Sequence, residues 1–315
     1  MRRNERVLLT GSTGFIGGAV HAALTASGVP VTRLVRRHGD HVPRAAGRDR
    51  VVIGDLGERT ALDDACTGAR VVIHAASYVG PDEQEQRRVN VEGTAALLAA
   101  ARAAGVERVV STSTVGVYGA ALPPGGAEEG ARPAPRSALS RSRLAADELV
   151  LAAGGLVVRP NLVHGPGDRW FLAPAVAAMQ LLAAWVGDGQ ARLSVIDRRT
   201  LGRLVAVLAL GDAAGGVFHA ALPSPVALGV LVCQVYARAR VPAPTLHLAP
   251  QDALTALAPL GITESQVRLL TTDSWFASDK IWCAAGMAPG PDPGHLSDEA
   301  LTWYARTLTI GHPSG

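Results

Sequence analysis

The sequence predicts a doubly wound parallel α/β sheet followed by a smaller second domain. Two observations favour this fold class. Short apolar strands alternate with helical stretches through the first half of the 315 residues, and a glycine-rich turn joins the first strand to the first helix. Strands that are apolar throughout suit a sheet covered by helices on both faces. The alternation implies parallel strands with right-handed crossovers.

The elements follow one another in a regular order up to about residue 159. We expect strands at 6–9, 31–35, 51–53, 71–74, 106–111 and 156–158, and helices up to 26 and at 60–66, 86–104 and 138–153. Pro160, Pro166 and Pro174 then interrupt the pattern, before a strand-like run at 193–197 and a helix at 201–210. The remainder reads as helical and irregular, and the Pro- and Gly-rich loop 120–136 is expected to be mobile and exposed. We therefore predict a first domain at 1–165 and a smaller substrate-binding domain at 166–315, with a helix at about 198–212 packing back on the first.

Composition excludes several function classes. The content of 48% hydrophobic and 18% charged residues is that of a globular protein. The net charge of +3 comes without a clustered basic stripe, so no nucleic-acid partner is expected. Three distant cysteines indicate neither a disulfide framework nor a metal site. No window approaches the roughly 20 apolar residues of a membrane span. We expect a soluble, cytoplasmic protein without a membrane partner.

The turn after the first strand has the glycine spacing of a dinucleotide-binding site. One glycine permits a tight turn, the second lets the backbone approach a pyrophosphate, and the third allows close helix–strand packing. The following helix presents free N–H groups and a positive dipole end to the phosphates. The alternative, a glycine-rich loop without a ligand, is weaker in this strand–turn–helix context. The predicted Rossmann-type turn comprises Gly11, Ser12, Thr13, Gly14, Phe15, Ile16 and Gly17.

The end of the second strand predicts the choice of cofactor. An acid there would bind a ribose 2′-hydroxyl, whereas an arginine accommodates a 2′-phosphate. The chain has Arg36 and Arg37, with no acid before Asp40. A guanidinium is permanently charged and fork-shaped, which suits a phosphate. We therefore favour NADP(H) over NAD(H), the alternative being two ordinary surface arginines in an Arg-rich chain.

Further segments resemble the extended short-chain dehydrogenase/reductase family, which includes sugar-nucleotide epimerases, dehydratases and ketoreductases. The matching segments are Gly54-Asp55-Leu56, His74-Ala75-Ala76-Ser77, Asn90-Val91-Glu92-Gly93-Thr94, Ser111 to Gly119 and Arg159 to Asp168. The resemblance implies that Asp55 and Leu56 lie at the adenine. It also places Ala75, Ala76 and Ser77 along the cofactor ribose, and it adds Thr112, Arg143, Pro160 and Val163 as cofactor contacts.

The chain departs from the family where the chemistry is expected. Family members carry a Tyr-x-x-x-Lys pair on the helix before the sixth strand, in which the Tyr moves the proton and the Lys lowers its pKa. By register with Ser142, those two positions are Leu139 and Arg143 here. Leucine transfers no proton, and arginine keeps the charge with a different geometry. Thr114, at the family's catalytic Ser/Thr position, and Ser113 are left as donors that could polarise a carbonyl.

The expected substrate site combines several loop residues with Leu139. Tyr78 follows the cofactor-lining strand, whereas Tyr118 is expected to pack structurally. His164 is a candidate acid, with a solvated loop histidine as its alternative. Large apolar side chains near the site, including Met179 and Trp185, could line a pocket for a large aromatic ligand or simply form core. The predicted substrate residues are Tyr78, Leu139, Asn161, His164, Trp170 and Phe171.

Three functions follow from this pattern. The favoured one is an NADPH-dependent ketoreductase acting on an aromatic polyketide of the angucyclinone type, with the proton supplied by a substrate hydroxyl or water. The sequence is similar to the atypical ketoreductases of actinobacterial antibiotic pathways. A non-catalytic NADP-binding sensor or scaffold is the first alternative. A nucleotide-sugar epimerase, dehydratase or 4-ketoreductase is the second, which Leu139 disfavours. As in family members, a homodimer could pair through the helices near 88–104 and 138–153.

Overall fold

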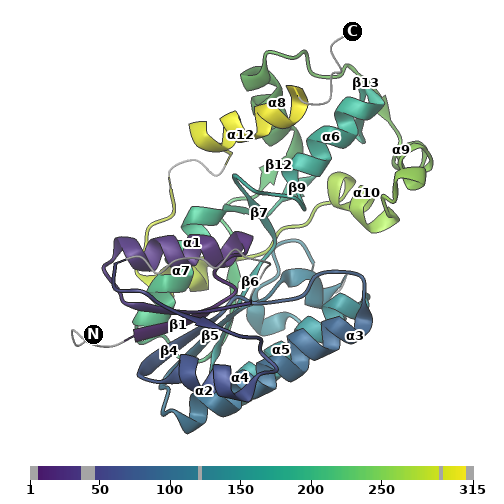
Figure 1. Cartoon of the computed structure of the whole chain (residues 1–315). Helices are drawn as coiled ribbons and strands as arrows, with labels where there is room; N and C mark the ends of the chain where they lie inside the picture. The colour runs from purple at the N-terminus through teal and green to yellow at the C-terminus, as the bar shows by residue number, and fades with distance from the viewer. Residues whose placement is uncertain (1–5, 37–46, 120–122, 291–293, 310–315) are drawn as a thin grey trace.

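One parallel sheet of seven strands forms the centre of the larger part of the molecule (Figure 1). The computed structural model describes residues 6–36, 47–119, 123–290 and 294–309. The strand order is β11-β6-β5-β4-β1-β2-β3. The doubly wound α/β prediction is therefore confirmed. The strands are β1 (Arg6–Thr10), β2 (Val31–Val35), β3 (Arg50–Ile53), β4 (Ala69–His74), β5 (Arg108–Thr112), β6 (Leu156–Pro160) and β11 (Gly216–Ala220).

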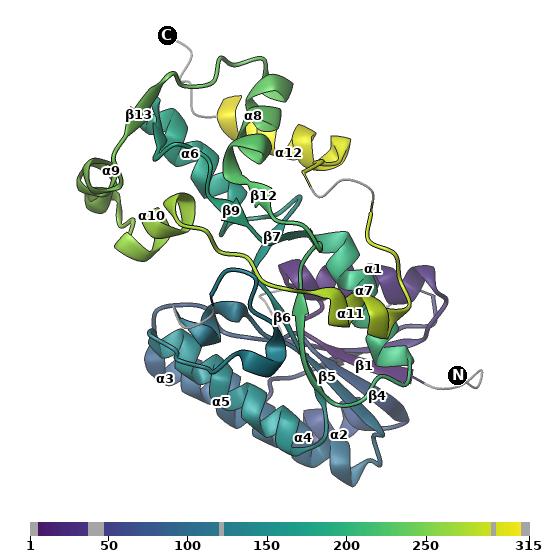
Figure 2. The ribbon, with the colours of Figure 1, turned by 180° about the vertical axis from the view of Figure 1, so that it is seen from behind.

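Helices cover both faces of this sheet. Alternate side chains of one strand enter different cores: Val7 and Leu9 join one buried cluster, and Leu8 joins the other. The first cluster lies under α1 (Phe15–Ala26) and α7 (Arg198–Leu210), which pack on each other. The second lies under α2 (Arg59–Cys66) and α4 (Gly93–Ala103). Beside α4 lies α5 (Ala138–Ala152), and α11 (Asp279–Ala285) packs on α7 and β11 (Figure 2).

The helix expected at 86–104 is longer than predicted. It begins as α3 (Glu83–Gln86), where the Asp82 side chain accepts the N–H groups of Gln84 and Glu85. It continues through a π-helical segment, Arg87–Glu92, directly into α4.

The seventh strand was missed, because the segment after residue 210 reads as irregular. Gly216–Ala220 is only five residues long and is cut off from the first half by the region of loops and helices. It pairs in parallel with β6, with Phe218 opposite Val158. The helix α7 and the strand β11 thus return the chain to the large sheet. The boundary between residues 165 and 166 stays a prediction.

The smaller part of the molecule is mainly helical, with three two-stranded ladders. The run predicted at 193–197 is broken at Ser194 into two strands with different partners. The helices of this smaller part are α6 (Leu172–Leu182), α8 (Leu228–Ala239), α9 (Pro250–Leu257), α10 (Glu264–Thr271) and α12 (Asp298–Thr309). Its strands are β7 (Leu162–His164), β8 (Ala184–Val186), β9 (Arg192–Leu193), β10 (Val195–Asp197), β12 (Val226–Ala227) and β13 (Leu246–Leu248). Within the described ranges, no helix is long and apolar enough to cross a membrane.

A buried ion pair fastens the centre of the molecule. Asp147 of α5 accepts Nε of Arg159 in β6 at 2.9 Å and the Ser113 hydroxyl at 2.9 Å. The Arg159 Nη1 atom donates to the Tyr118 hydroxyl at 2.7 Å, and that oxygen also meets His219 Nε2 of β11 at 2.9 Å. Both charged side chains are almost fully buried. Burial raises the pKa of Asp147, and the Arg159 guanidinium opposes this shift.

We expect Asp147→Ala to lower the free energy of unfolding by about 3–5 kcal/mol, because Arg159 would be left charged and buried without a carboxylate. Urea unfolding of the purified variant measures this. The matched control is Glu148→Ala, at an exposed position of the same helix, which should change stability by less than about 0.5 kcal/mol. Equal losses in the two variants would contradict a special role for the pair.

Candidate active site

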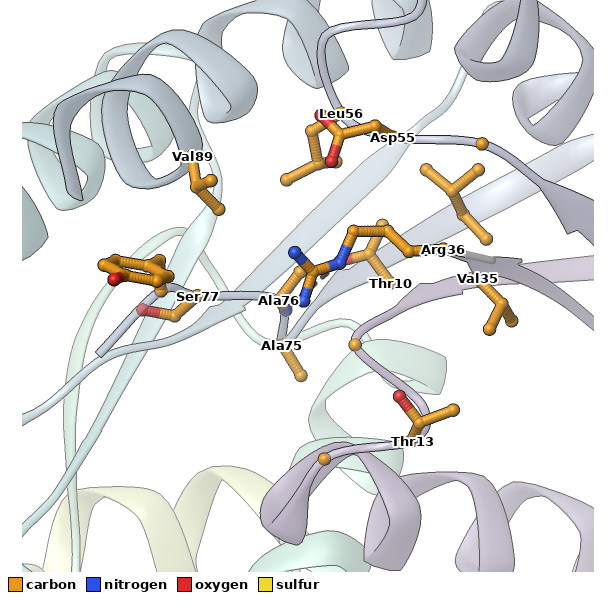
Figure 3. A pocket seen from close by; sticks show the side chains of 15 residues that line it. Thr10, Thr13, Val35, Arg36, Asp55, Leu56, Ala75, Ala76, Ser77 and Val89 are labelled. Atoms are coloured by element: carbon orange, nitrogen blue, oxygen red, sulfur yellow. Dashed lines mark hydrogen bonds between the residues drawn. The ribbon is translucent and has the colours of Figure 1, made fainter. Parts of the chain in front are cut away.

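A cavity of about 580 Å³ opens where β1, β2, β3 and β4 end (Figure 3). Nine of the predicted cofactor residues line it: Gly11, Thr13, Gly14, Arg36, Asp55, Leu56, Ala75, Ala76 and Ser77. Tyr78, expected at the substrate, lines it as well. Sequence reasoning missed Thr10, Leu34, Val35, Gly54 and Val89. Thr10, Val35 and Gly54 directly precede residues that were predicted, so the strand ends themselves carried the signal.

The glycine turn packs against the end of β4 without room for side chains. Gly11 has φ +71°, and a Cβ there would lie 2.5 Å from the Ala75 carbonyl carbon. A Cβ at Gly17 would lie 2.1 Å from the Gly11 oxygen. Ser12, Phe15, Ile16 and Gly17 lie within the turn and the first helical turn without lining the cavity.

The same turn fits a pyrophosphate. Helix α1 begins after Gly14, which offers no side-chain cap to the N–H groups of the first turn. The buried Ser12 hydroxyl has no hydrogen-bond partner among the described residues. Unpaired donors at a helix N-terminus form an anion site. The residues present therefore fit the phosphates of a dinucleotide.

Charged side chains surround the other end of the cavity. Arg36 extends from the end of β2 into the cavity (Figure 3). Asp55 accepts the Gly57 N–H at 3.0 Å and Arg88 Nη1 at 3.0 Å. Burial alone would raise the pKa of Asp55, but these hydrogen bonds and the nearby arginines together lower it. Arg37 lies outside the described residues.

A neutral histidine lies beneath the cavity. His74 Nδ1 meets Thr10 Oγ1 at 2.7 Å, and its Nε2 meets Thr94 Oγ1 at 3.0 Å. Burial, with a smaller effect of the Arg143 charge, lowers the pKa of His74 to about 3. The imidazole is therefore neutral at pH 7 and joins β1, β4 and α4 as one donor and one acceptor.

Asn90 connects the cavity to α5. Its Oδ1 accepts the Tyr78 N–H at 2.8 Å and the Ser77 hydroxyl at 3.1 Å. Its Nδ2 donates to Ser142 Oγ at 3.0 Å. The next residue, Arg143, donates to the Thr112 carbonyl oxygen. Burial lowers the pKa of Arg143, and the Asp147 charge opposes this shift. Arg143 and Thr112 thus contact each other, and neither lines the cavity.

A second cavity, of about 610 Å³, lies at the N-terminal end of α5. A Cβ at Gly116 would lie 3.4 Å from Thr114 Oγ1 and 3.5 Å from Ser140 Oγ, so both hydroxyls flank the cavity wall at Gly116. Thr114 Oγ1 accepts the Gly116 N–H at 3.0 Å. The cavity is lined by Val115, Gly116, Gly119, Pro123, Pro124, Arg136, Ser137, Ser140, Ser265, Arg268, Leu269, Thr272, Asp273, Ser274, Trp275 and Phe276.

The residues predicted for catalysis and substrate are dispersed rather than gathered in this cavity. The Ser113 hydroxyl is buried and donates to Asp147, so it is not available to a carbonyl. Asn161 does not line the cavity. Its Nδ2 donates to the carbonyl oxygen of Ser274, which does line it, at 3.0 Å. The Leu139 carbonyl accepts the Ser142 hydroxyl within α5. Leu139 does not line either large cavity.

The remaining aromatic and histidine candidates lie elsewhere. His164 is 2% exposed rather than a solvated loop residue, burial lowers its pKa, and neither ring nitrogen has a hydrogen-bond partner among the described residues. Phe171 is buried core, as are Met179 and Trp185. Trp170 is 58% exposed and lies against the Phe15 ring, with centroids 5.9 Å apart. Pro160 is buried in β6, and Val163 is partly buried in β7.

The loop predicted to be mobile is fastened in its described part, from residue 123 onward. Gly125 N–H donates to the Trp275 oxygen at 2.9 Å, and Ala277 N–H donates to the Gly126 oxygen at 3.1 Å. Glu128 accepts the backbone N–H of His219 at 2.6 Å. The loop therefore forms one wall of the second cavity. Its wall residues were missed because they come from segments about 130 positions apart in the chain.

Comparisons with known proteins agree with this fold. Residues 7–201 match the model of the NAD dependent epimerase/dehydratase family. A 4-hydroxy-2-methyl-3-oxo-4-farnesyl-3,4-dihydroquinoline-1-oxide ketoreductase from Stigmatella aurantiaca is 32% identical over 196 residues, which are 59% of this chain and 58% of that protein. The chain spans between 35% and 58% of the length of the first curated relatives that it matches.

Two further likenesses extend over nearly the whole chain. A 3-diazoavenalumate denitrifying reductase from a Streptomyces species is 31% identical over 303 residues, covering 90% of this chain and 96% of that protein. The structure of UDP-glucose 4-epimerase from Thermotoga maritima superposes with a TM-score of 0.75 at 16% identity, covering 97% of this chain and 99% of that one. This structural likeness shows the fold alone. With its family model matching well over half of its length, the chain belongs to the NAD dependent epimerase/dehydratase family.

Proposed function

We propose that the protein is an NADPH-dependent ketoreductase that reduces a carbonyl of an aromatic polyketide of the angucyclinone type. The single observation that carries the proposal is the second cavity of about 610 Å³ beside Thr114, separate from the one that fits the cofactor. A sensor or scaffold that only binds NADP needs no such cavity. The sequence also resembles the angucyclinone ketoreductase of simocyclinone biosynthesis.

The relatives support a reductase. The Stigmatella protein is named as a ketoreductase of a compound with a 3-oxo group on a dihydroquinoline ring. A 2-alkyl-3-oxoalkanoate reductase from Stenotrophomonas maltophilia is 31% identical over 258 residues. A fused-ring or β-keto carbonyl is therefore the kind of electrophile that we assign to this chain. Nucleotide-sugar epimerisation is less well supported, because Leu139 replaces the tyrosine that removes the proton.

The cofactor, when bound, supplies a hydride to the carbonyl carbon, and the residues of the chain hold the two reactants. We assign the pyrophosphate to the turn from Gly11 to Gly14 and the 2′-phosphate to Arg36. Asn90 and Ser142 join the Tyr78 backbone at the first cavity to α5, whose N-terminal end lines the second cavity. Positioning of this kind supplies much of the rate enhancement in a two-reactant step.

The carbonyl oxygen gains negative charge that must be neutralised. The Thr114 hydroxyl lies next to Gly116 of the second cavity wall without lining the cavity itself. We propose that it donates a hydrogen bond to the carbonyl oxygen, because the Gly116 N–H uses only an acceptor lone pair of this hydroxyl. An alcohol of ordinary acidity polarises a carbonyl but protonates it poorly. We therefore assign the proton to a substrate hydroxyl adjacent to the carbonyl, or to water. We also propose a homodimer, in which two copies of the chain pair through α4 and α5.

The direct test is NADPH oxidation with 8-hydroxy-1-tetralone, in which a phenol lies beside the carbonyl. We expect turnover of this ketone at least about tenfold faster than of 8-methoxy-1-tetralone, because one lost hydrogen bond to developing charge costs about 1.4 kcal/mol or more. Absorbance at the nicotinamide band and product analysis measure both. Absence of NADPH oxidation with either ketone would count against the ketoreductase.

The NADPH assignment predicts a selective effect of Arg36→Ala. Loss of a charge-assisted contact with the 2′-phosphate should weaken NADPH binding about 10- to 100-fold, with little change for NADH. Calorimetric titration with each cofactor measures the two constants. Arg102→Ala, an exposed position on α4, is the control and should change neither. An equal loss of affinity for both cofactors would contradict the assignment of the 2′-phosphate to Arg36.

The Leu139→Tyr variant should not raise the turnover rate. Its new hydroxyl would stand one helical turn from Arg143, whose guanidinium is held by the Thr112 carbonyl and cannot take over the position of a lysine ammonium. Steady-state kcat with 8-hydroxy-1-tetralone is the measurement. The control is Leu139→Phe, which adds the ring without the hydroxyl. A large gain in the tyrosine variant alone would show that the missing acid limits this protein.

A further inference from the structure

We propose that the second cavity recognises an anionic group on its substrate, a carboxylate or a phosphate, through Arg136 and Arg268. The substrate class is then an anionic aromatic ketone. This inference rests on the proposed function for the ketone, but the anion recognition is independent of it. We call the part of the cavity wall formed by these two arginines the anion end.

The anion end carries two guanidinium groups that line the same cavity. Both side chains are exposed and line the cavity. Neither forms an ion pair in the described part of the chain, whereas Arg88, Arg159 and Arg199 each contact a carboxylate. Two unpaired, like-charged groups facing one cavity raise the local concentration of anions.

The acid in the cavity wall is already engaged. Asp273 Oδ1 accepts the backbone N–H of Arg192 at 2.8 Å. The guanidinium of Arg192 is itself nearby, 5.2 Å from the centroid of the Trp275 ring. Two arginines and one aspartate line this cavity, so its wall keeps an excess of positive charge.

The two arginines come from different elements of the cavity wall. Arg136 directly precedes Ser137, whose hydroxyl caps α5 by accepting the Ser140 N–H at 3.0 Å. Arg268 lies on α10. Residues with hydroxyl groups line the same cavity: Ser137, Ser140, Ser265, Thr272 and Ser274. Planar guanidinium groups with hydroxyl donors bind the oxygens of a carboxylate or a phosphate.

A fixed aromatic side chain provides the apolar wall. The Trp275 oxygen accepts Gly125 N–H at 2.9 Å, and a Cβ at Gly125 (φ +79°) would lie 3.0 Å from the Trp275 ring. The loop therefore holds the indole in place through a close backbone contact. A rigid indole offers a surface against which a flat aromatic ring can pack. An aromatic body and an anionic group on the same ligand satisfy both features of the cavity.

The test compares the binding of matched probes that cannot be reduced. We would titrate the NADP⁺-saturated protein by calorimetry with 2-naphthoate, 2-naphthamide, 2-naphthyl phosphate and UDP. The variants are Arg136→Gln, Arg268→Gln and Trp275→Leu. The matched control is Arg203→Gln, at an exposed position of α7. Thermal melting of each variant confirms that it is folded.

We expect naphthoate or naphthyl phosphate to bind about tenfold more tightly than naphthamide, as a charge-assisted contact implies. Each Arg→Gln change should remove about that factor for the anions and leave the amide within about twofold. Trp275→Leu should weaken the three naphthyl probes alike. Arg203→Gln should change nothing. The tighter of the two anions identifies whether a carboxylate or a phosphate is the group recognised.

Two results would overturn the proposal. Equal affinity for naphthoate, naphthyl phosphate and naphthamide would remove the anion end. Tighter binding of UDP than of every naphthyl probe, with the same dependence on the arginines, would replace the aromatic ketone by a nucleotide. Failure to oxidise NADPH with the tetralones would leave these results intact, because no probe in the titration requires hydride transfer.

Discussion

The buried pair of Asp147 and Arg159 is the interaction on which the arrangement of both cavities depends. It joins α5 to β6, and its hydrogen bonds continue to Ser113 after β5 and to Tyr118. Through Tyr118 the same network reaches His219 of β11, the outer strand of the sheet. Removing either charge would expose the other to an apolar interior that cannot solvate it. The pair therefore specifies one position for α5 relative to the sheet.

A fixed α5 connects the wall of the second cavity to residues at the edge of the first. Residues 140–143 run from the wall of the second cavity to the contact with the Thr112 carbonyl. On the other side, Ser142 meets Asn90, which holds the backbone of Tyr78 at the edge of the first cavity. Leu139, directly before this stretch, is the residue that the sequence predicts at the position of the family's acid. A shift of α5 by one turn would change the residues that face the second cavity, so the network also preserves the register of this wall.

The sequence predicts those parts of the molecule that depend on local pattern. The six strands and the turn from Gly11 to Gly17 could be located, because alternation and glycine spacing are encoded over a few residues each. The strand β11 could not be, since five residues gain their strand character from pairing with β6. The second cavity was missed for a related reason. Arg136 and Trp275 are distant in the chain, and backbone hydrogen bonds of Gly125 and Gly126 bring their segments together. Phe171 and Ser113 carry functional residue types, but packing and Asp147 direct them into the interior.

The contact between Arg143 and the Thr112 carbonyl has a consequence for how the rate at such a site depends on pH. An arginine keeps its proton across the physiological range, and a threonine hydroxyl does not titrate there. A tyrosine–lysine pair would give the protein an ionisable group of its own that determines how the rate depends on pH. Arg143 and Thr112 supply no such group. If the proposed reductase takes its proton from a substrate phenol, the pH dependence of the rate follows the pKa of that phenol and therefore differs from one substrate to the next.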